Sequence, residues 1–251
     1  MRLILAIIRR EIHGYFVSPI AYTVIAGFLL ISGYGFLKAI ETYTSISPLQ
    51  FALEQISIQR DLIPRLNNWA NLATLLCVPA LSMRLFSEER KGGTIELLLT
   101  SPMTTGQLVL GKYLGAFVVY AMIVAMTVPY MVVLGRIGNP DWGAVVATYI
   151  GYALFGGVLL AVGLFASAIT ENQIVALVIT YALFLPFFLI DELATFVGSE
   201  VGDVLAGLSV SLSKYQFTQG VIDTHDLVLN GSLIFLFLFL SAQVLDSSRW
   251  R

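Results

Sequence analysis

Charged residues are scarce in this sequence. Of its 251 residues, 14 are Lys or Arg and 16 are Asp or Glu, so only 12% of the chain is charged. A soluble domain carries about 25% charged residues, and the mean hydropathy of +0.84 is high to match. Lipid is therefore the expected solvent for much of the chain. The composition excludes a disordered protein, and a net charge of −2 without a basic stripe excludes nucleic acid as a partner.

The residue types of common catalytic and metal sites are also rare. Cys77 is the single cysteine, which excludes an internal disulfide and predicts a small buried side chain. The two histidines, His13 and His225, fall on opposite sides of the membrane in the topology that the charges predict, so a histidine-based site within one chain is not expected. We expect the chain to have no enzymatic activity, no metal and no cofactor of its own.

One segment partly resembles a phosphate-binding loop. The stretch from Gly106 to Lys112 fits the first seven positions of the motif, but Tyr113 stands where a Ser or Thr should hold magnesium. The segment also leads into an apolar run rather than a soluble helix. We therefore expect no ATP hydrolysis here, and we expect Lys112 to anchor a membrane helix at the lipid head groups.

Six stretches are long and apolar enough to cross a bilayer, which takes about 20 residues in a helix. Backbone groups in hydrocarbon must bond to one another, and these stretches lack the alternation of a membrane β-strand. The predicted fold class is an all-α polytopic membrane protein with a single transmembrane domain over residues 1–251. The spans lie near residues 20–40, 66–86, 108–135, 142–170, 172–190 and 227–245.

Prolines and small residues are expected to affect the bending and the packing of these spans. Three spans contain a proline and are expected to bend there: Pro79, Pro129 and Pro186. The fourth span carries a row of small residues at Ala153, Gly157 and Ala161. Such a row permits close contact with another helix, or it only eases packing within the chain.

The distribution of basic residues predicts the orientation. Six spans place both termini on one side, and the cytoplasmic side carries an excess of Lys and Arg. With the termini in the cytoplasm, nine basic residues lie inside: Arg2, Arg9, Arg10, Arg84, Arg90, Lys91, Lys112, Arg249 and Arg251. Five lie outside: Lys38, Arg60, Arg65, Arg136 and Lys214. Cytoplasmic termini are therefore expected.

Residues 1–16 are predicted to form a helix that lies on the cytoplasmic surface of the membrane. Arg9, Arg10 and His13 fall on one arc of this helix, and apolar residues fill the rest. Glu11 interrupts the apolar arc, so it is expected to pair with a basic group or to face another helix. The segment is too short and too soon followed by charge to be a signal peptide. The alternative is that it only extends the first span.

The cytoplasmic loop at residues 87–107 is the most informative part of the sequence. Gly92 and Gly93 interrupt the chain after a charged cluster, Thr94 can cap a short helix, and Pro102 stops it. This helix presents four apolar residues: Ile95, Leu97, Leu98 and Leu99. Such a surface needs a groove on a partner protein, or it lies flat on the bilayer.

Short motifs are spread over most of the chain: Pro79-x-Leu81-x-Met83-Arg84, Glu88-Glu89-Arg90, Gly93-Thr94-x-Glu96, Leu98, Ser101-Pro102, Gly111-Lys112, Arg10-Glu11 with Ser18-Pro19, and Gly220-Val221-Ile222-Asp223. Together they resemble the ABC-2 type permeases. The most similar branch is that of the gliding-motility and nitrous-oxide-reductase maturation permeases.

The resemblance implies a permease subunit that works with a separate cytoplasmic ABC ATPase, which binds the ATP and the magnesium. It implies contact with that ATPase through a coupling helix and its flanks: Glu88, Glu89, Arg90, Gly93, Thr94, Ile95, Glu96, Leu97, Leu98, Leu99, Ser101 and Pro102. It also makes residues 1–16 an interface helix, with Arg9, Arg10 and Glu11 near the ATPase.

The resemblance further implies the assembly. Two copies form a twelve-helix homodimer in a bacterial or archaeal cytoplasmic (inner) membrane, with an external region at 191–226 shaping the outer gate and an extracytoplasmic auxiliary protein as a further partner. The expected function is substrate export driven by ATP. The alternative is a membrane motor that moves an external partner without passing a solute, because the spans carry few polar residues.

Overall fold

The computed structural model describes residues 2–45, 62–96, 103–137, 140–194, 210, 217 and 220–248, and every regular element among them is helical. The helices are α1 (Arg2–Val17), α2 (Pro19–Ser45), α4 (Ile63–Ser82), α5 (Ser87–Lys91), α7 (Thr105–Ala125), α8 (Val128–Ile137), α9 (Trp142–Ile169), α10 (Gln173–Ala194) and α13 (Thr224–Ser248). The predicted all-α class is confirmed.

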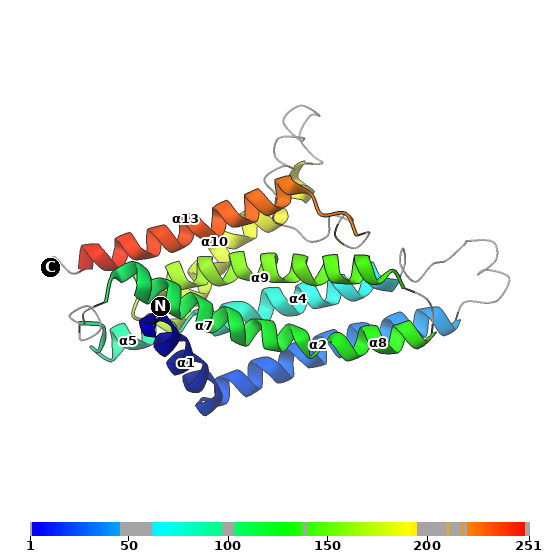
Figure 1. The fold of residues 1–251 in the computed structure, drawn as a ribbon, viewed down its shortest axis with the longest axis horizontal. Coiled ribbons are helices and arrows are strands. Elements are labelled where there is room, and N and C mark those ends of the chain that lie inside the picture. Colours follow the sequence, from blue (N-terminus) through cyan, green and yellow to red (C-terminus); the bar gives the residue numbers. More distant parts are fainter. Residues whose placement is uncertain are drawn as a thin grey trace.

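Six apolar stretches in these helices are long enough to cross a membrane, which confirms the six expected spans. They are Pro19–Thr42, Ile63–Lys91, Thr105–Ile137, Trp142–Ile169, Gln173–Ile190 and Thr224–Ser247. The corresponding long helices run alongside one another in a bundle, while α1 lies at an angle to it (Figure 1). The chain is a multi-pass membrane protein.

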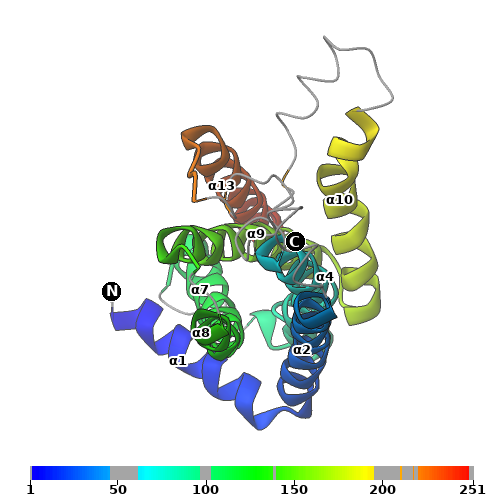
Figure 2. The same ribbon diagram turned by 90° about the vertical axis from the view of Figure 1, so that its right-hand side faces the viewer.

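Helix α9 lies at the centre of the bundle. It packs against α4, α7, α10 and α13, and 78% of its most apolar stretch is buried, against 17% for α10. Figure 2 shows α9 between its neighbours and α10 at the periphery. A Cβ atom at Gly156 or Gly163 would overlap the Tyr120 ring or the Ser82 side chain, so glycine permits these close approaches. The small residue Gly157 similarly faces α7 and α13, which assigns it to packing within the chain.

The prolines affect the helices differently. The third span is interrupted at Met126 and Thr127, close to the position where a bend was expected. Pro129 lies in the first turn of α8, where the missing N–H of a proline is tolerated. Pro79 and Pro186 instead lie inside the continuous helices α4 and α10. Cys77 is half-buried rather than fully buried.

Helix α1 does not extend the first span. It ends at Val17, Ser18 separates it from α2, and it packs across α7 with a smaller contact to α2. Ile7 and Tyr15 point into the bundle, whereas Leu5 and Val17 remain 64% and 69% exposed. The exposed apolar side chains suit an interfacial position, where lipid covers them.

Candidate functional site

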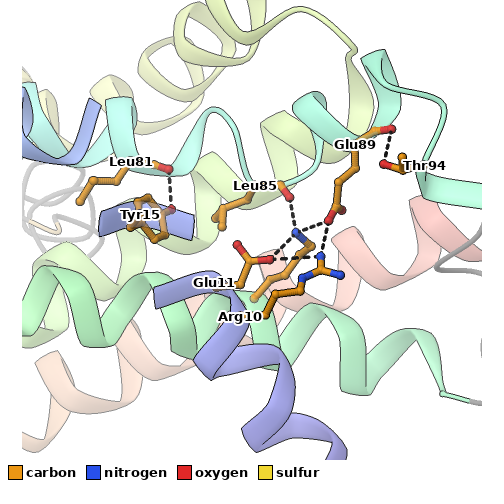
Figure 3. Close-up of polar contacts among 8 residues, drawn as sticks. Arg10, Glu11, Tyr15, Leu81, Leu85, Glu89 and Thr94 are labelled. Atoms are coloured by element: carbon orange, nitrogen blue, oxygen red, sulfur yellow. Dashed lines mark hydrogen bonds and ion pairs between the residues drawn. The ribbon is translucent and has the colours of Figure 1, made fainter. Parts of the chain in front are cut away.

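Four charged side chains from three helices meet at one end of the bundle. Arg10 and Glu11 come from α1, Glu89 from α5 and Lys112 from α7. The Lys112 Nζ atom lies 2.8 Å from Glu11 Oε1 and 2.9 Å from Glu89 Oε1. The Arg10 guanidinium lies 2.6 Å from the same Glu89 oxygen (Figure 3). We call these four residues the charged cluster and this end of the molecule the charged end.

Lys112 is the centre of the charged cluster. Its side chain is 2% exposed, and its ammonium group donates to Glu11, to Glu89 and, at 2.7 Å, to the carbonyl oxygen of Leu85. An ammonium group has three protons, so each finds an acceptor. The expectation that Lys112 anchors at the lipid head groups was wrong, because α1 and α5 cover it. Glu11 does pair with a basic group, as predicted.

A second contact joins α1 to the end of α4. The Tyr15 hydroxyl donates to the Leu81 carbonyl oxygen at 2.7 Å (Figure 3), and the Arg84 guanidinium lies 4.2 Å from the centre of the Tyr15 ring. Burial raises the pKa of Tyr15 well above its ordinary value, so the phenol stays neutral and keeps its donor proton. Arg84 stacks on the ring by a cation–π interaction.

Two glycines allow α1 to lie close to α7. A Cβ atom at Gly111 would be 2.8 Å from the Ile7 side chain, and one at Gly115 would be 2.8 Å from Glu11 Cβ. The two glycines are four residues apart, so they lie on one face of α7. This close approach brings Glu11 within reach of Lys112. The segment from Gly106 to Lys112 that partly resembles a phosphate loop lies entirely within α7, which starts at Thr105.

The segment expected to contact an ATPase begins directly beside the charged cluster. Helix α5 ends at Lys91 with Gly92 as its C-cap, and Gly93 has φ +67°, a conformation that suits glycine. The Thr94 amide then donates to the Glu89 carbonyl at 3.0 Å. Ile95 is half-buried against the core, and Glu96 is exposed. The residues Leu97, Leu98, Leu99, Ser101 and Pro102 lie outside the described residues.

The other predicted residues take different positions. Arg9 and Glu88 are exposed and do not belong to the charged cluster, while Arg90 is half-buried on α5. Helix α5 itself was not predicted, and neither were the contacts of Tyr15, Arg84, Lys112 and Gly115. Lys112 does carry a signal in the sequence, because it begins an apolar run at a distance from any acidic residue.

The far side of the same loop is also held. Thr104 accepts a hydrogen bond from the Gln107 amide while the Gln107 side chain accepts from the Thr104 amide, a capping box that starts α7. The next residue, Thr105, donates from its hydroxyl to the Asp246 carboxylate near the end of α13. The loop is therefore tied to α1 and α7 at its start and to α13 at its end.

An open cleft of about 700 Å³ lies between α1 and α5, with residues of the charged cluster in its wall. It is also lined by Arg84, His13 and Gln173. In the described part of the chain, no group of three or more His, Cys, Asp and Glu residues is placed to hold a metal ion. The arrangement can transmit a displacement between helices, because its charges are paired with one another across three elements.

The described residues thus form a six-span helical bundle with the charged cluster at the start of the loop over residues 87–107. The family model described as ABC-2 family transporter protein matches residues 35–219. The chain belongs to this family, and the match includes α4, α5 and α7 but not α1. No curated protein matches the chain.

Proposed function

We propose that the chain is the permease subunit of an ABC transporter and receives its driving force from a separate cytoplasmic ATPase through residues 87–107. The membership in the ABC-2 family supports the subunit class. The observation that carries the coupling role is the charged cluster, in which Glu89 at the start of this loop is bonded to α1 and α7 at once.

Coupling through this loop transmits a displacement from the ATPase to the membrane helices. When two ATPase subunits close on ATP, they displace the coupling helix, which is proposed to cover roughly residues 94–101. The displacement reaches α1 and α7 through Glu89 and reaches α13 through Thr105. Rigid helices carry it across the membrane, as in a two-state switch biased from a distant site.

The proposal includes the remaining partners. The ATPase binds ATP and magnesium, two copies of the chain form a homodimer in the inner membrane, and an extracytoplasmic auxiliary protein joins the complex. Both termini are in the cytoplasm, so the charged end faces the ATPase.

The variant Leu98→Asp tests the coupling role. Burial of a leucine at the joint stabilises it by about 1.5–3 kcal/mol, so a charged residue there should abolish most of the permease-dependent stimulation of the ATPase. The measurement is ATPase activity and co-purification from proteoliposomes. Asn172→Asp is the control, because it adds the same charge at an exposed position in the turn before α10, outside residues 1–16 and 87–107. Coupling that survives Leu98→Asp would contradict the proposal.

Solute flux separates the two versions of the proposal. Proteoliposomes that contain the permease and its ATPase should move a solute or lipid when ATP is added outside. Nucleotide hydrolysis and conformational change without flux would instead favour the membrane motor.

A further inference from the structure

A cleft at the opposite end of the bundle brings together two basic residues that are far apart in the sequence. It lies between α2 and α4, has a volume of about 350 Å³, and is lined by Lys38 and Arg65 among others. These are two of the five basic residues assigned to that side of the membrane, and 26 residues separate them. Neither residue belongs to the charged cluster.

Two facing stripes of side chains build this cleft. On α2, Tyr34, Lys38 and Thr42 follow one another at four-residue spacing. On α4, Asn68 and Trp69 follow Arg65 by three and four residues, which places all three on one face. The Tyr34 and Trp69 rings meet edge to face at 5.0 Å, and Lys38 Nζ lies 6.0 Å from the Tyr34 ring. Aromatic and basic residues together are typical of the membrane–water interface.

Gly35 sets the shape of the cleft. A Cβ atom at this position would lie 2.4 Å from Trp69 Cβ, so only glycine lets the indole rest against the backbone of α2. The resulting wall is held from both helices, and Lys38 and Arg65 stand at its rim.

The donors in this cleft outnumber the acceptors that the described residues offer them. Lys38 pairs with the exposed Glu41 at 2.8 Å. Within the described ranges, the side chains of Arg65 and Asn68 and the Trp69 indole N–H make no hydrogen bond or ion pair, although all three residues line the cleft. An oxyanion with several acceptor oxygens would satisfy such a set of donors.

The surface next to the cleft is apolar toward the middle of the membrane. The α4 stripe continues from Trp69 to Leu72 and Leu76, which are 41% and 47% exposed, and Leu30 on α2 is 74% exposed. Donors at the interface with exposed leucines below them match the chemistry of a phosphate group joined to acyl chains.

From this arrangement we infer that the α2–α4 cleft binds the head-group phosphate of an anionic phospholipid. Lys38 and Arg65 supply the charge, Asn68 and Trp69 donate hydrogen bonds, and the leucines contact the acyl chains. The proposal is independent of ATPase coupling, because the cleft lies at the other end of α2 and α4 from the charged cluster.

Trp69 provides a probe for this site. Trp142→Phe and Trp250→Phe leave Trp69 as the only tryptophan, and its fluorescence in nanodiscs reports on brominated lipid chains beside it. Brominated phosphatidylglycerol should quench Trp69 with an apparent affinity at least about fivefold higher than brominated phosphatidylcholine, since each interfacial cation favours an anionic lipid by about that factor.

In this background, Lys38→Gln together with Arg65→Gln should reduce the preference to about one. Arg136→Gln is the matched control, because Arg136 is an exposed basic residue on α8 at the same end, and it should leave the preference unchanged. Both substituted side chains are exposed, so the fold is not at risk.

Two outcomes would overturn the inference. The first is a phosphatidylglycerol preference that persists in the double variant or falls equally with Arg136→Gln. The second is full displacement of the lipid by excess inorganic phosphate, which would show that the cleft recognises a free anion. Retention of phosphatidylglycerol by the unaltered chain but not by the double variant, seen by native mass spectrometry, would support it independently.

Discussion

At the scale of single residues, the charged end depends on Lys112. Its ammonium group donates to Glu11 on α1, to Glu89 on α5 and to the Leu85 carbonyl oxygen between α4 and α5. The two carboxylates share the Lys112 cation at less than 3 Å, and removing it leaves them with the exposed Arg10 guanidinium, which lies 2.6 Å from Glu89 and 3.5 Å from Glu11. Both glutamates are about 15% exposed or less, so solvent screens them only weakly.

Lys112→Met should destabilise the folded protein by about 3 kcal/mol, since breaking the buried ion pairs leaves Glu11 and Glu89 without their buried counter-ion. The check is the midpoint of thermal unfolding in detergent. Lys91→Met is the control, because Lys91 is exposed on α5 and should change stability by no more than about 0.5 kcal/mol. Equal effects of the two substitutions would refute the role of the cluster.

Tyr15 offers a second test at this scale. Tyr15→Phe removes the hydrogen bond to Leu81 but keeps the ring under Arg84, so we expect a loss of about 1 kcal/mol. Tyr15→Ala also removes the buried ring and should cost about 3–5 kcal/mol. Thermal unfolding of both variants measures the difference, and similar losses would mean that the ring contributes little.

The interactions of Glu11 could be predicted from the sequence, but those of Lys112 could not. Glu11 was expected to find a basic partner because a carboxylate on an apolar arc is costly to leave unpaired, and this was correct. Lys112 was misjudged because a lysine at the end of an apolar run commonly reaches the lipid head groups. Its burial follows from the crossing of α1 over α7, which no local pattern encodes.

At the scale of elements, the closeness of α1 and α7 is set by Gly111 and Gly115. The six spans could be predicted because each is a continuous apolar run that must satisfy its backbone internally. Helix α5 could not, because five residues form a stable helix only when packing supports them, and here the buried Phe86 and Ser87 anchor its start.

Gly111→Ala tests this crossing. The added methyl group would lie under 3 Å from Ile7, so α1 must shift, at a cost of about 1–3 kcal/mol. Gly106→Ala is the control on the same helix, since nothing lies within 4 Å of its Cβ position; it should be neutral or stabilising by up to about 1 kcal/mol. The midpoint of thermal unfolding distinguishes them, and an unaffected Gly111→Ala variant would contradict the close contact.

At the scale of the whole molecule, the basic residues predict that the charged end faces the cytoplasm. Labelling can test this orientation, because Cys77 is the single native cysteine and can be replaced by serine. In that background, an impermeant maleimide added to intact cells should label Arg136→Cys and not Glu96→Cys, both positions being exposed. The reverse pattern would place the charged end outside and exclude contact with a cytoplasmic ATPase.

The central position of α9 has a consequence for biogenesis. Two of the helices that enclose it, α10 and α13, follow it in the chain, so they enter the membrane after α9. Lipid must then surround the surfaces that these helices later cover. The apolar character of α9 on all sides thus suits the lipid that surrounds it during insertion. Its glycines suit the close helix packing of the finished bundle.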